Sequence, residues 1–186
     1  MLVADDHKLT REMIGHVLSA LECKRVRFVP DGAAAFVEIV NAPPDLAIVD
    51  FHMPLDGLQL LNKVRRAANS PDSALPVIVM TSLTDRKRIE ALRDAGATEI
   101  IAKPFTAAAV LSRIAAVIDS PRPFIATRAF IGPCRRRGRI RNTPGPIAAR
   151  ATRPWSTSNE QLQPQTPRGT VSPASPGDGA GRPMCC

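Results

Sequence analysis

The stretch LAIVDFHMP, residues 46–54, decides the fold that we expect for this chain of 186 residues. Its first four residues are aliphatic, an aspartate follows at position 50, and a proline closes it at position 54. A brief aliphatic run without polar alternation is typical of a strand that is covered on both faces, as in a parallel sheet between helices. Asp50 would then stand at the carboxyl end of a buried strand.

Four further apolar runs of similar length recur up to residue 119, and amphipathic stretches separate them. The runs cover residues 2–4, 26–29, 77–80 and 99–102. Apolar residues repeat at helical spacing in the sets Ile14, Val17, Leu18 and Leu21; Leu58, Leu61, Val64 and Ala68; and Val110, Leu111, Ile114, Val117 and Ile118. Gly96 follows residues 86–95, where a helix would end with a residue of positive φ. The alternation predicts an α/β domain over residues 1–119, with five βα units around a parallel sheet.

Polar side chains gather where the predicted strands end. Asp5 and Asp6 follow the first strand, Asp50 the third, Thr81 the fourth and Lys103 the fifth. With right-handed crossovers and the strand order 2-1-3-4-5, the first and third strands are neighbours, so the three aspartates would share one pocket. Carboxylates that close repel one another unless a hard dication neutralises them, and Mg²⁺ prefers carboxylates, waters and a phosphate oxygen. The pocket therefore predicts a Mg²⁺ site.

Lys103 and Thr81 add groups that suit phosphoryl oxygens. The Lys103 ammonium would hold one oxygen, and the Thr81 hydroxyl would donate a hydrogen bond to another as charge develops. Asp50 is then the expected nucleophile, because attack of a carboxylate on phosphorus gives an aspartyl phosphate. These residues leave the phosphate donor unspecified.

In order and separation, four groups of residues resemble the receiver domain of bacterial two-component response regulators: Asp5-Asp6, Asp50-Phe51-His52-Met53-Pro54 with Gly57, Thr81-Ser82, and Lys103-Pro104-Phe105. The resemblance covers residues 1–119. It implies a flavodoxin-like fold and phosphotransfer to Asp50 from a sensor histidine kinase or a histidine phosphotransferase. It also implies a phosphoacceptor signalling domain rather than an enzyme, whose altered surface is read by a downstream protein partner.

The resemblance further implies a role for each residue of the site. Mg²⁺ would be held by Asp6, Asp50 and the backbone carbonyl of His52, with Asp5 assisting through water. Thr81 and Lys103 would bind the phosphoryl oxygens. In the family, an aromatic residue three positions before the lysine moves with the threonine hydroxyl and alters the surface of the fourth and fifth helices and the fifth strand. Here that position is Ile100, so the aromatic part of the switch is missing.

A phosphatase of the haloacid-dehalogenase kind is a rival interpretation, because it also uses an acidic pocket, Mg²⁺, threonine and lysine. Those enzymes place a second aspartate two residues after the nucleophile, where this chain has His52. We therefore favour the receiver. His7, His16 and His52 are expected to be structural or exposed to solvent, because their spacing supplies no partners for a metal or phosphohistidine role.

Beyond residue 119 the pattern dissolves. Residues 121–186 hold 11 of the 18 prolines, with 11 basic against 2 acidic residues, whereas residues 1–120 hold 14 basic against 15 acidic. Such a composition buries too little apolar surface to offset its ordering entropy, so we expect residues 120–186 to be a disordered tail without an output domain. Its one apolar cluster leaves an alternative, an extended strap on the domain surface, made by Phe124, Ile125, Phe130 and Ile131.

The basic run at residues 135–141 would permit non-specific contact with nucleic acid. No helix-turn-helix periodicity or aromatic stacking platform accompanies it, so sequence-specific reading is not expected. A transcriptional or nucleic-acid-associated regulator that uses this tail remains the alternative function. The four cysteines lack metal-ligand spacing and are expected to be reduced thiols. The chain shows neither a signal-peptide pattern nor a run of about 18 apolar residues, so we expect a cytoplasmic protein without membrane contact.

Overall fold

The structure, a computed structural model, describes residues 1–82 and 85–135. A five-stranded sheet lies at the centre of this part, and its neighbouring strands all pair in parallel. The strands, in spatial order, are β2 (Arg27–Val29), β1 (Leu2–Ala4), β3 (Ala47–Asp50), β4 (Val77–Thr81) and β5 (Glu99–Ala102). The predicted strand order and the flavodoxin-like fold are confirmed.

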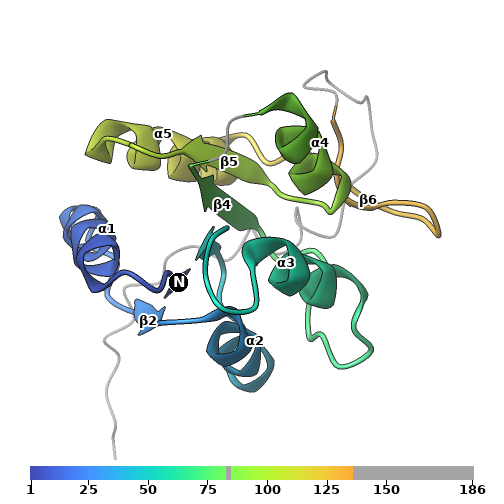
Figure 1. Cartoon of the computed structure of the whole chain (residues 1–186), viewed down its shortest axis with the longest axis horizontal. Helices are drawn as coiled ribbons and strands as arrows, with labels where there is room; N and C mark the ends of the chain where they lie inside the picture. The colour runs from blue at the N-terminus through green and yellow to red at the C-terminus, as the bar shows by residue number, and fades with distance from the viewer. Residues whose placement is uncertain (83–84, 136–186) are drawn as a thin grey trace, which may run out of the picture. The chain divides into compact units, whose positions relative to one another are not determined.

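Two helical layers cover the sheet, with α1 and α5 on one face and α2, α3 and α4 on the other (Figure 1). The helices are α1 (Lys8–Ala20), α2 (Gly32–Asn41), α3 (Gly57–Arg66), α4 (Arg86–Asp94) and α5 (Ala107–Asp119). Successive side chains of a strand point to opposite faces, so Leu2 and Ala4 join the core of α2 and α3, whereas Val3 joins that of α1 and α5. Apolar side chains of the strands fill the cores on both faces of the sheet. Polar side chains of a functional site are therefore expected at the strand ends and in the loops that follow them.

Four helices begin at a residue whose side chain accepts a hydrogen bond from the backbone N–H three residues later; these residues are Asp31, Asp56, Asp85 and Thr106. α1 differs, because its N-cap residue is His7 and the His7 side chain makes no capping hydrogen bond. The paired aspartates before α1 therefore do not serve as its N-cap.

Two helix ends test the sequence analysis. Gly96 follows α4 with a φ of +93°, as expected from its position. The stripe predicted from Leu58 to Ala68 is too long, because α3 ends at Arg66 and Ala67 turns to an extended conformation. The helix can end there because two of its last carbonyl oxygens still accept hydrogen bonds, that of Lys63 from the Ala67 N–H and that of Val64 from the Ser70 hydroxyl.

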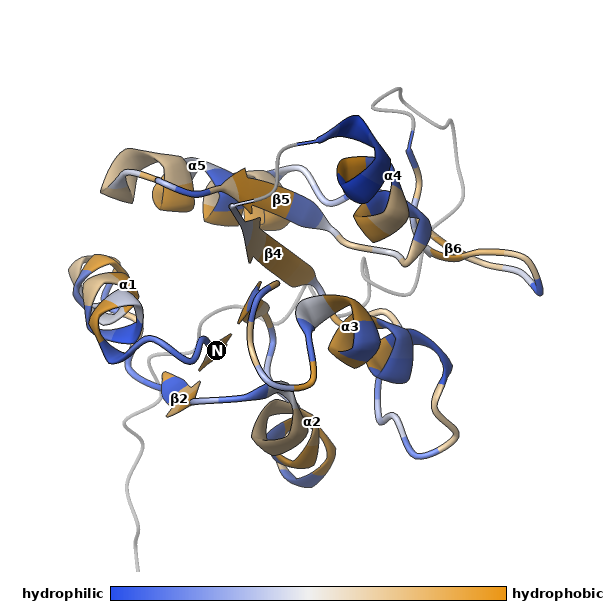
Figure 2. Ribbon diagram, viewed as in Figure 1, coloured by the Kyte–Doolittle hydropathy of each residue, from blue (hydrophilic) through white to orange (hydrophobic). Residues whose placement is uncertain are grey.

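The prediction of disorder from residue 120 is wrong for the first part of the tail. Strands β6 (Phe124–Ala126) and β7 (Ile131–Pro133) pair antiparallel and form a hairpin. Figure 2 shows that this hairpin is largely apolar, unlike the charged outer side of α4. Partly buried Phe124, Ile125, Phe130 and Ile131 form the apolar part, because they find cover on the body of the domain that the sequence could not specify.

The remainder of the predicted tail, residues 136–186, lies outside the described residues, as do the basic residues of the 135–141 run after Arg135. Among the helices that the structure describes, none has the length and apolar character needed to span a membrane.

Candidate functional site

Three of the predicted site residues meet at the carboxyl end of the sheet. Asp5 follows β1, Asp50 is the last residue of β3, and Lys103 follows β5. The Lys103 Nζ atom lies 2.9 Å from Asp5 Oδ2 and 2.8 Å from Asp50 Oδ1. The parallel arrangement brings these ends together, so residues up to 98 positions apart along the chain share one cluster.

Both carboxylates of this cluster are almost fully buried, with exposed fractions of 0% for Asp5 and 1% for Asp50. Burial alone lowers the pKa of Lys103, but its close contacts with Asp50 and Asp5 outweigh burial and raise that pKa above its usual value. The lysine is therefore charged at neutral pH. One ammonium group faces two carboxylates, so the buried cluster retains a net negative charge.

The two oxygens of Asp50 have different surroundings. Oδ2 accepts a hydrogen bond of 3.1 Å from the backbone N–H of His52. Oδ1 is buried and receives no hydrogen bond of acceptable geometry from the described residues, although the Lys103 ammonium lies close enough to form an ion pair. Because this oxygen shares the single ammonium of Lys103 with Asp5, it is suited to accept a further positive centre.

Backbone contacts fix the loop between β1 and α1. The N–H of His7 donates a hydrogen bond of 2.8 Å to Asp5 Oδ1. From near the start of α1, Arg11 Nη1 donates to the carbonyl oxygens of Asp5 at 2.6 Å and Asp6 at 3.1 Å. This role of Arg11 could not be predicted from the sequence, because an arginine near the start of an amphipathic helix looks like any other exposed charge.

Asp6 lies at the outer side of the cluster and is more exposed than its neighbour. Its Oδ1 atom is 2.7 Å from His7 Nδ1, and the His7 side chain is mostly exposed, in line with the structural or exposed role expected from the sequence. One ligand atom from each of Asp5, Asp6 and His7 lies within 4.8 Å of the others. The loop thus offers a compact group of metal-ligating atoms.

The loop after β3 passes very close to the backbone of Asp50. A Cβ atom at Gly57 would lie 2.7 Å from the carbonyl oxygen of Asp50, which explains why glycine begins α3. The N–H of Gly57 donates to the Phe51 carbonyl at 3.1 Å. His52 is exposed between them, and its ring meets the Phe51 ring edge-on with centroids 4.9 Å apart.

Ile100 lies in β5 as expected, whereas Thr81, expected just after the fourth strand, is the last residue of β4. Thr81 is buried at the end of β4, where its carbonyl oxygen accepts a hydrogen bond of 2.8 Å from the N–H of Lys103. Ile100 pairs in register with Val79 in the middle of β5 and packs, partly buried, against the core of α2 and α3. An aliphatic side chain therefore fills the position of the absent aromatic.

The donor set fits a hard dication. The side chains of Asp5, Asp6 and Asp50 carry three negative charges, whereas Lys103 brings one positive charge to the cluster. Oxygen ligands bind Mg²⁺ at about 2.0–2.1 Å, so the carboxylates of Asp5 and Asp6, which have ligand atoms within 4.8 Å of one another, can share one ion. The incompletely compensated Oδ1 of Asp50 points to the same requirement for positive charge.

Comparison with known proteins agrees with this fold. The family model of the response regulator receiver domain matches residues 1–115. A probable chemotaxis protein CheY from Rhizobium etli is 31% identical over 121 residues, which cover 64% of this chain and 92% of the relative. Response regulator MprA from a Mycobacterium species is 32% identical over 124 residues, which cover 66% of this chain and 52% of MprA, so the match spans about half of that relative.

Two solved structures are similar to the same part of the chain. Chemotaxis protein CheY4 of Vibrio cholerae is 26% identical with a TM-score of 0.57, covering 62% of this chain and 95% of CheY4. A putative response regulator from Chloroflexus aurantiacus is 30% identical with a TM-score of 0.57, covering 62% of this chain and 93% of its own. With its family match, strand order and acidic cluster, the chain belongs to the response regulator receiver domain family of two-component systems.

Proposed function

We propose that this receiver domain accepts a phosphoryl group on Asp50 and passes the signal to a protein partner through its altered surface. One observation carries the proposal: Asp50 is a buried carboxylate whose Oδ1 atom faces a lysine ammonium but receives no hydrogen bond from the described residues. A nucleophile needs an oxygen with an available lone pair, held close to groups that offset the charge of the incoming phosphoryl group.

In the proposed reaction, an oxygen of Asp50 forms a bond to phosphorus while the bond between phosphorus and the donor breaks. With a phosphohistidine donor, the electron pair of that bond returns to the imidazole nitrogen, which then takes up a proton. The chain contributes positioning and charge stabilisation rather than a further covalent step. Backbone donation from His52 to Oδ2 orients the carboxylate for this attack.

Lys103 and Thr81 would hold the transferred group. Lys103 starts between Asp5 and Asp50, and on phosphorylation its ammonium would pair with a phosphoryl oxygen. The Thr81 hydroxyl would donate a hydrogen bond to a second oxygen. Mg²⁺ would be held by Asp6, Asp50 and the backbone carbonyl of His52, with Asp5 assisting through water, and when bound it neutralises charge on the phosphoryl oxygens.

The partners follow from this chemistry. The donor would be a sensor histidine kinase or a histidine phosphotransferase, and the receiver of the signal a downstream protein. Because Ile100 replaces an aromatic residue in β5, the surface change would rest on backbone and aliphatic movements instead of a rotating ring. The alternative of nucleic-acid binding depends on residues after Arg135, which lie outside the described part of the chain.

The test is direct phosphorylation of the full chain. The protein would be incubated with acetyl phosphate and Mg²⁺, and the modified residue mapped by mass spectrometry. We expect a single aspartyl phosphate at Asp50, loss of the label in Asp50→Asn, and little label when Mg²⁺ is chelated. Asp45→Asn is the matched control, because it makes the same chemical change at an exposed position just before β3.

Labelling of another carboxylate in the unmodified protein, or equal labelling of Asp50→Asn, would refute the assignment of the phosphoacceptor. Equal labelling with and without Mg²⁺ would refute only the role of the metal. The folded state of each variant would be checked by circular dichroism, so that a loss of label is not mistaken for a loss of structure.

A further inference from the structure

Helix α4 is held to the domain by fewer buried side chains than any other described helix. Only Leu92 of this helix is buried, whereas every other described helix buries at least two residues. Figure 2 shows a largely hydrophilic α4. Its ion pairs, Arg86 with Glu90 and Arg88 with Asp85, are exposed and local, so they stabilise the helix without fastening it to the sheet.

The hairpin of β6 and β7 fastens the carboxyl end of this helix. Arg135, just after β7, forms an ion pair with Asp94, the last residue of α4, but both side chains are exposed, so this pair adds little by itself. The backbone of the hairpin at Gly132 also lies against the backbone just after α4 at Gly96. A Cβ atom at Gly132 would lie only 2.6 Å from the Cα atom of Gly96. A Cβ atom at Gly96 would in turn collide with the carbonyl oxygen of Ile131. Two glycines therefore permit an approach that no other residue type would.

The hairpin is itself anchored to other elements of the domain. In the segment before β6, Arg122 pairs with the buried Glu99 of β5 at 3.3 Å, and Glu99 also pairs with Arg113 of α5 at 3.3 Å. The Phe124 ring lies over the buried guanidinium of Arg65, 5.4 Å from ring centroid to the guanidinium carbon. The end of the hairpin where Phe124 pairs with Pro133, with the residues that flank it, thus contacts α3 through Arg65, β5 through Glu99 and α4 through Asp94.

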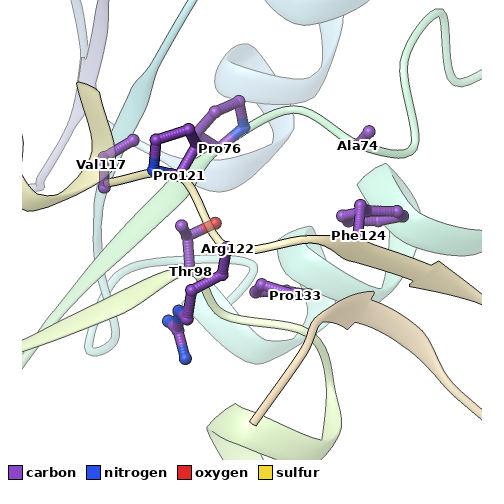
Figure 3. Close-up of a pocket in the computed structure, with 8 residues that line it drawn as sticks. All are labelled: Ala74, Pro76, Thr98, Val117, Pro121, Arg122, Phe124 and Pro133. Atoms are coloured by element: carbon purple, nitrogen blue, oxygen red, sulfur yellow. The ribbon is translucent and has the colours of Figure 1, made fainter. Parts of the chain in front are cut away.

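Figure 3 shows how closely the hairpin and its preceding segment sit on the amino end of the sheet. Side chains from the two sides enclose a cavity of about 20 Å³, the room of roughly one water molecule. It is lined, among others, by Pro121, Arg122, Phe124 and Pro133 on one side and by Pro76 and Thr98 on the other. The base of the hairpin is therefore seated against the domain, whereas its turn, residues 126–129, is exposed.

We propose that the hairpin is a clamp on α4, such that docking of residues 124–133 and ordering of α4 are coupled. The amino end of α4 lies a few residues after Thr81 at the acidic site, and its carboxyl end meets the hairpin, from which the chain continues into residues 136–186. Along the chain, the weakly anchored helix α4 follows Thr81 at the acidic site and precedes the hairpin that contacts its carboxyl end. Coupling of this kind is reciprocal, so loosening either partner loosens the other.

Hydrogen exchange of the full chain, followed by mass spectrometry, tests the clamp without requiring phosphorylation. Gly132→Glu places bulk and charge where only a hydrogen fits and should undock the hairpin, and Arg135→Gln removes the ion pair with Asp94. We expect exchange across residues 86–96 to rise about tenfold in Gly132→Glu and less in Arg135→Gln, with exchange in α1 and α2 unchanged. Arg128→Gln is the matched control, because it removes the same charge from the exposed hairpin turn.

Two outcomes would overturn the clamp. If hairpin amides, such as those of Thr127 and Cys134, exchange faster in Gly132→Glu while residues 86–96 stay protected, α4 does not depend on the hairpin. If the hairpin amides keep their protection in Gly132→Glu, the close contact with Gly96 does not hold the hairpin in place. Neither result would bear on phosphorylation at Asp50, which the acetyl phosphate experiment tests separately.

Discussion

Charged side chains are buried at both ends of the central sheet, but the two ends differ in how many hydrogen-bond partners those charges have. At the carboxyl end, Asp5 and Asp50 share one lysine, and Asp50 Oδ1 receives no hydrogen bond from the described residues. At the amino end, the guanidinium of Arg65 donates hydrogen bonds of 2.8–3.1 Å to the carbonyl oxygens of Gly96, Ser73 and Leu75. A charge with all its partners supplied holds a structure together, whereas one left short of partners is available for chemistry.

The buried guanidinium of Arg65 stays charged and finds hydrogen-bond acceptors for its donors. Burial lowers its pKa to about 10, and the charge of Asp72 opposes that change, so the side chain remains protonated at neutral pH. Its planar donors reach two separate loops, the one before β4 and the one before β5. The guanidinium thereby replaces backbone hydrogen bonds that neither loop could make alone.

Loss of Arg65 should be the largest stability defect that this comparison predicts. Arg65→Ala removes the donors to three carbonyl oxygens and leaves space beneath the hairpin, so we expect unfolding to become easier by about 3–5 kcal/mol. Urea denaturation monitored by circular dichroism would measure it. Arg66→Ala is the control. Arg66 is exposed, so its loss should change the free energy of unfolding by only a few tenths of a kcal/mol. Equal effects of the two changes would contradict a structural role for the buried guanidinium.

A smaller loss of stability, with its own pH dependence, is expected when Lys103 is replaced at the carboxyl end of the sheet. In Lys103→Met two buried carboxylates lose their cation, so without Mg²⁺ the variant should be less stable at pH 7 by roughly 1–3 kcal/mol. The fold raises the pKa of Lys103, so the lysine stabilises fully below about pH 10.5 and loses this contribution as the pH rises through its folded pKa.

The gap between Lys103→Met and the unmodified protein should therefore narrow above about pH 10.5. Urea unfolding at a series of pH values in the presence of a chelator would measure the gap. Lys87→Met, which alters an exposed lysine of α4, should show no such trend. A gap that stays constant into the alkaline range would mean that the lysine acts through packing and not through its charge.

The smallest losses of stability are expected from two glycine substitutions, one at each end of the sheet, which should differ in their effects on labelling and hydrogen exchange. Gly57→Ala and Gly96→Ala each place a methyl group against backbone, and Gly96 also has positive φ, so we expect each to cost roughly 1–2 kcal/mol. Only Gly57→Ala should slow labelling of Asp50 by acetyl phosphate, because only Gly57 lies against its backbone. Only Gly96→Ala should speed hydrogen exchange in the hairpin. The reverse assignment of these two effects would break the proposed division between the ends.

Much of the carboxyl end followed from short stretches of sequence. The aliphatic run before Asp50 and the polar residues after three other strands were enough to predict convergence of Asp5, Asp50 and Lys103, because parallel strands place their carboxyl ends together. Gly96 was also recognisable as the residue after a helix. The contacts of Arg11 and His7 with the aspartates were not, since neither residue type at a helix start is specific for such a role.

The sequence by itself determined the order of strands and helices and the meeting of Asp5, Asp50 and Lys103, because hydrophobic periodicity and strand-end residues act over a few positions. Only the tertiary structure decided that residues 124–133 form a docked hairpin and that Arg65 is a buried tie. Those features depend on pairings such as Arg65 with Gly96 and Arg135 with Asp94, 31 and 41 residues apart. A segment rich in proline and arginine becomes ordered when a surface offers matching carboxylates, carbonyls and close-approach glycines, and that surface exists only after the rest of the chain has folded.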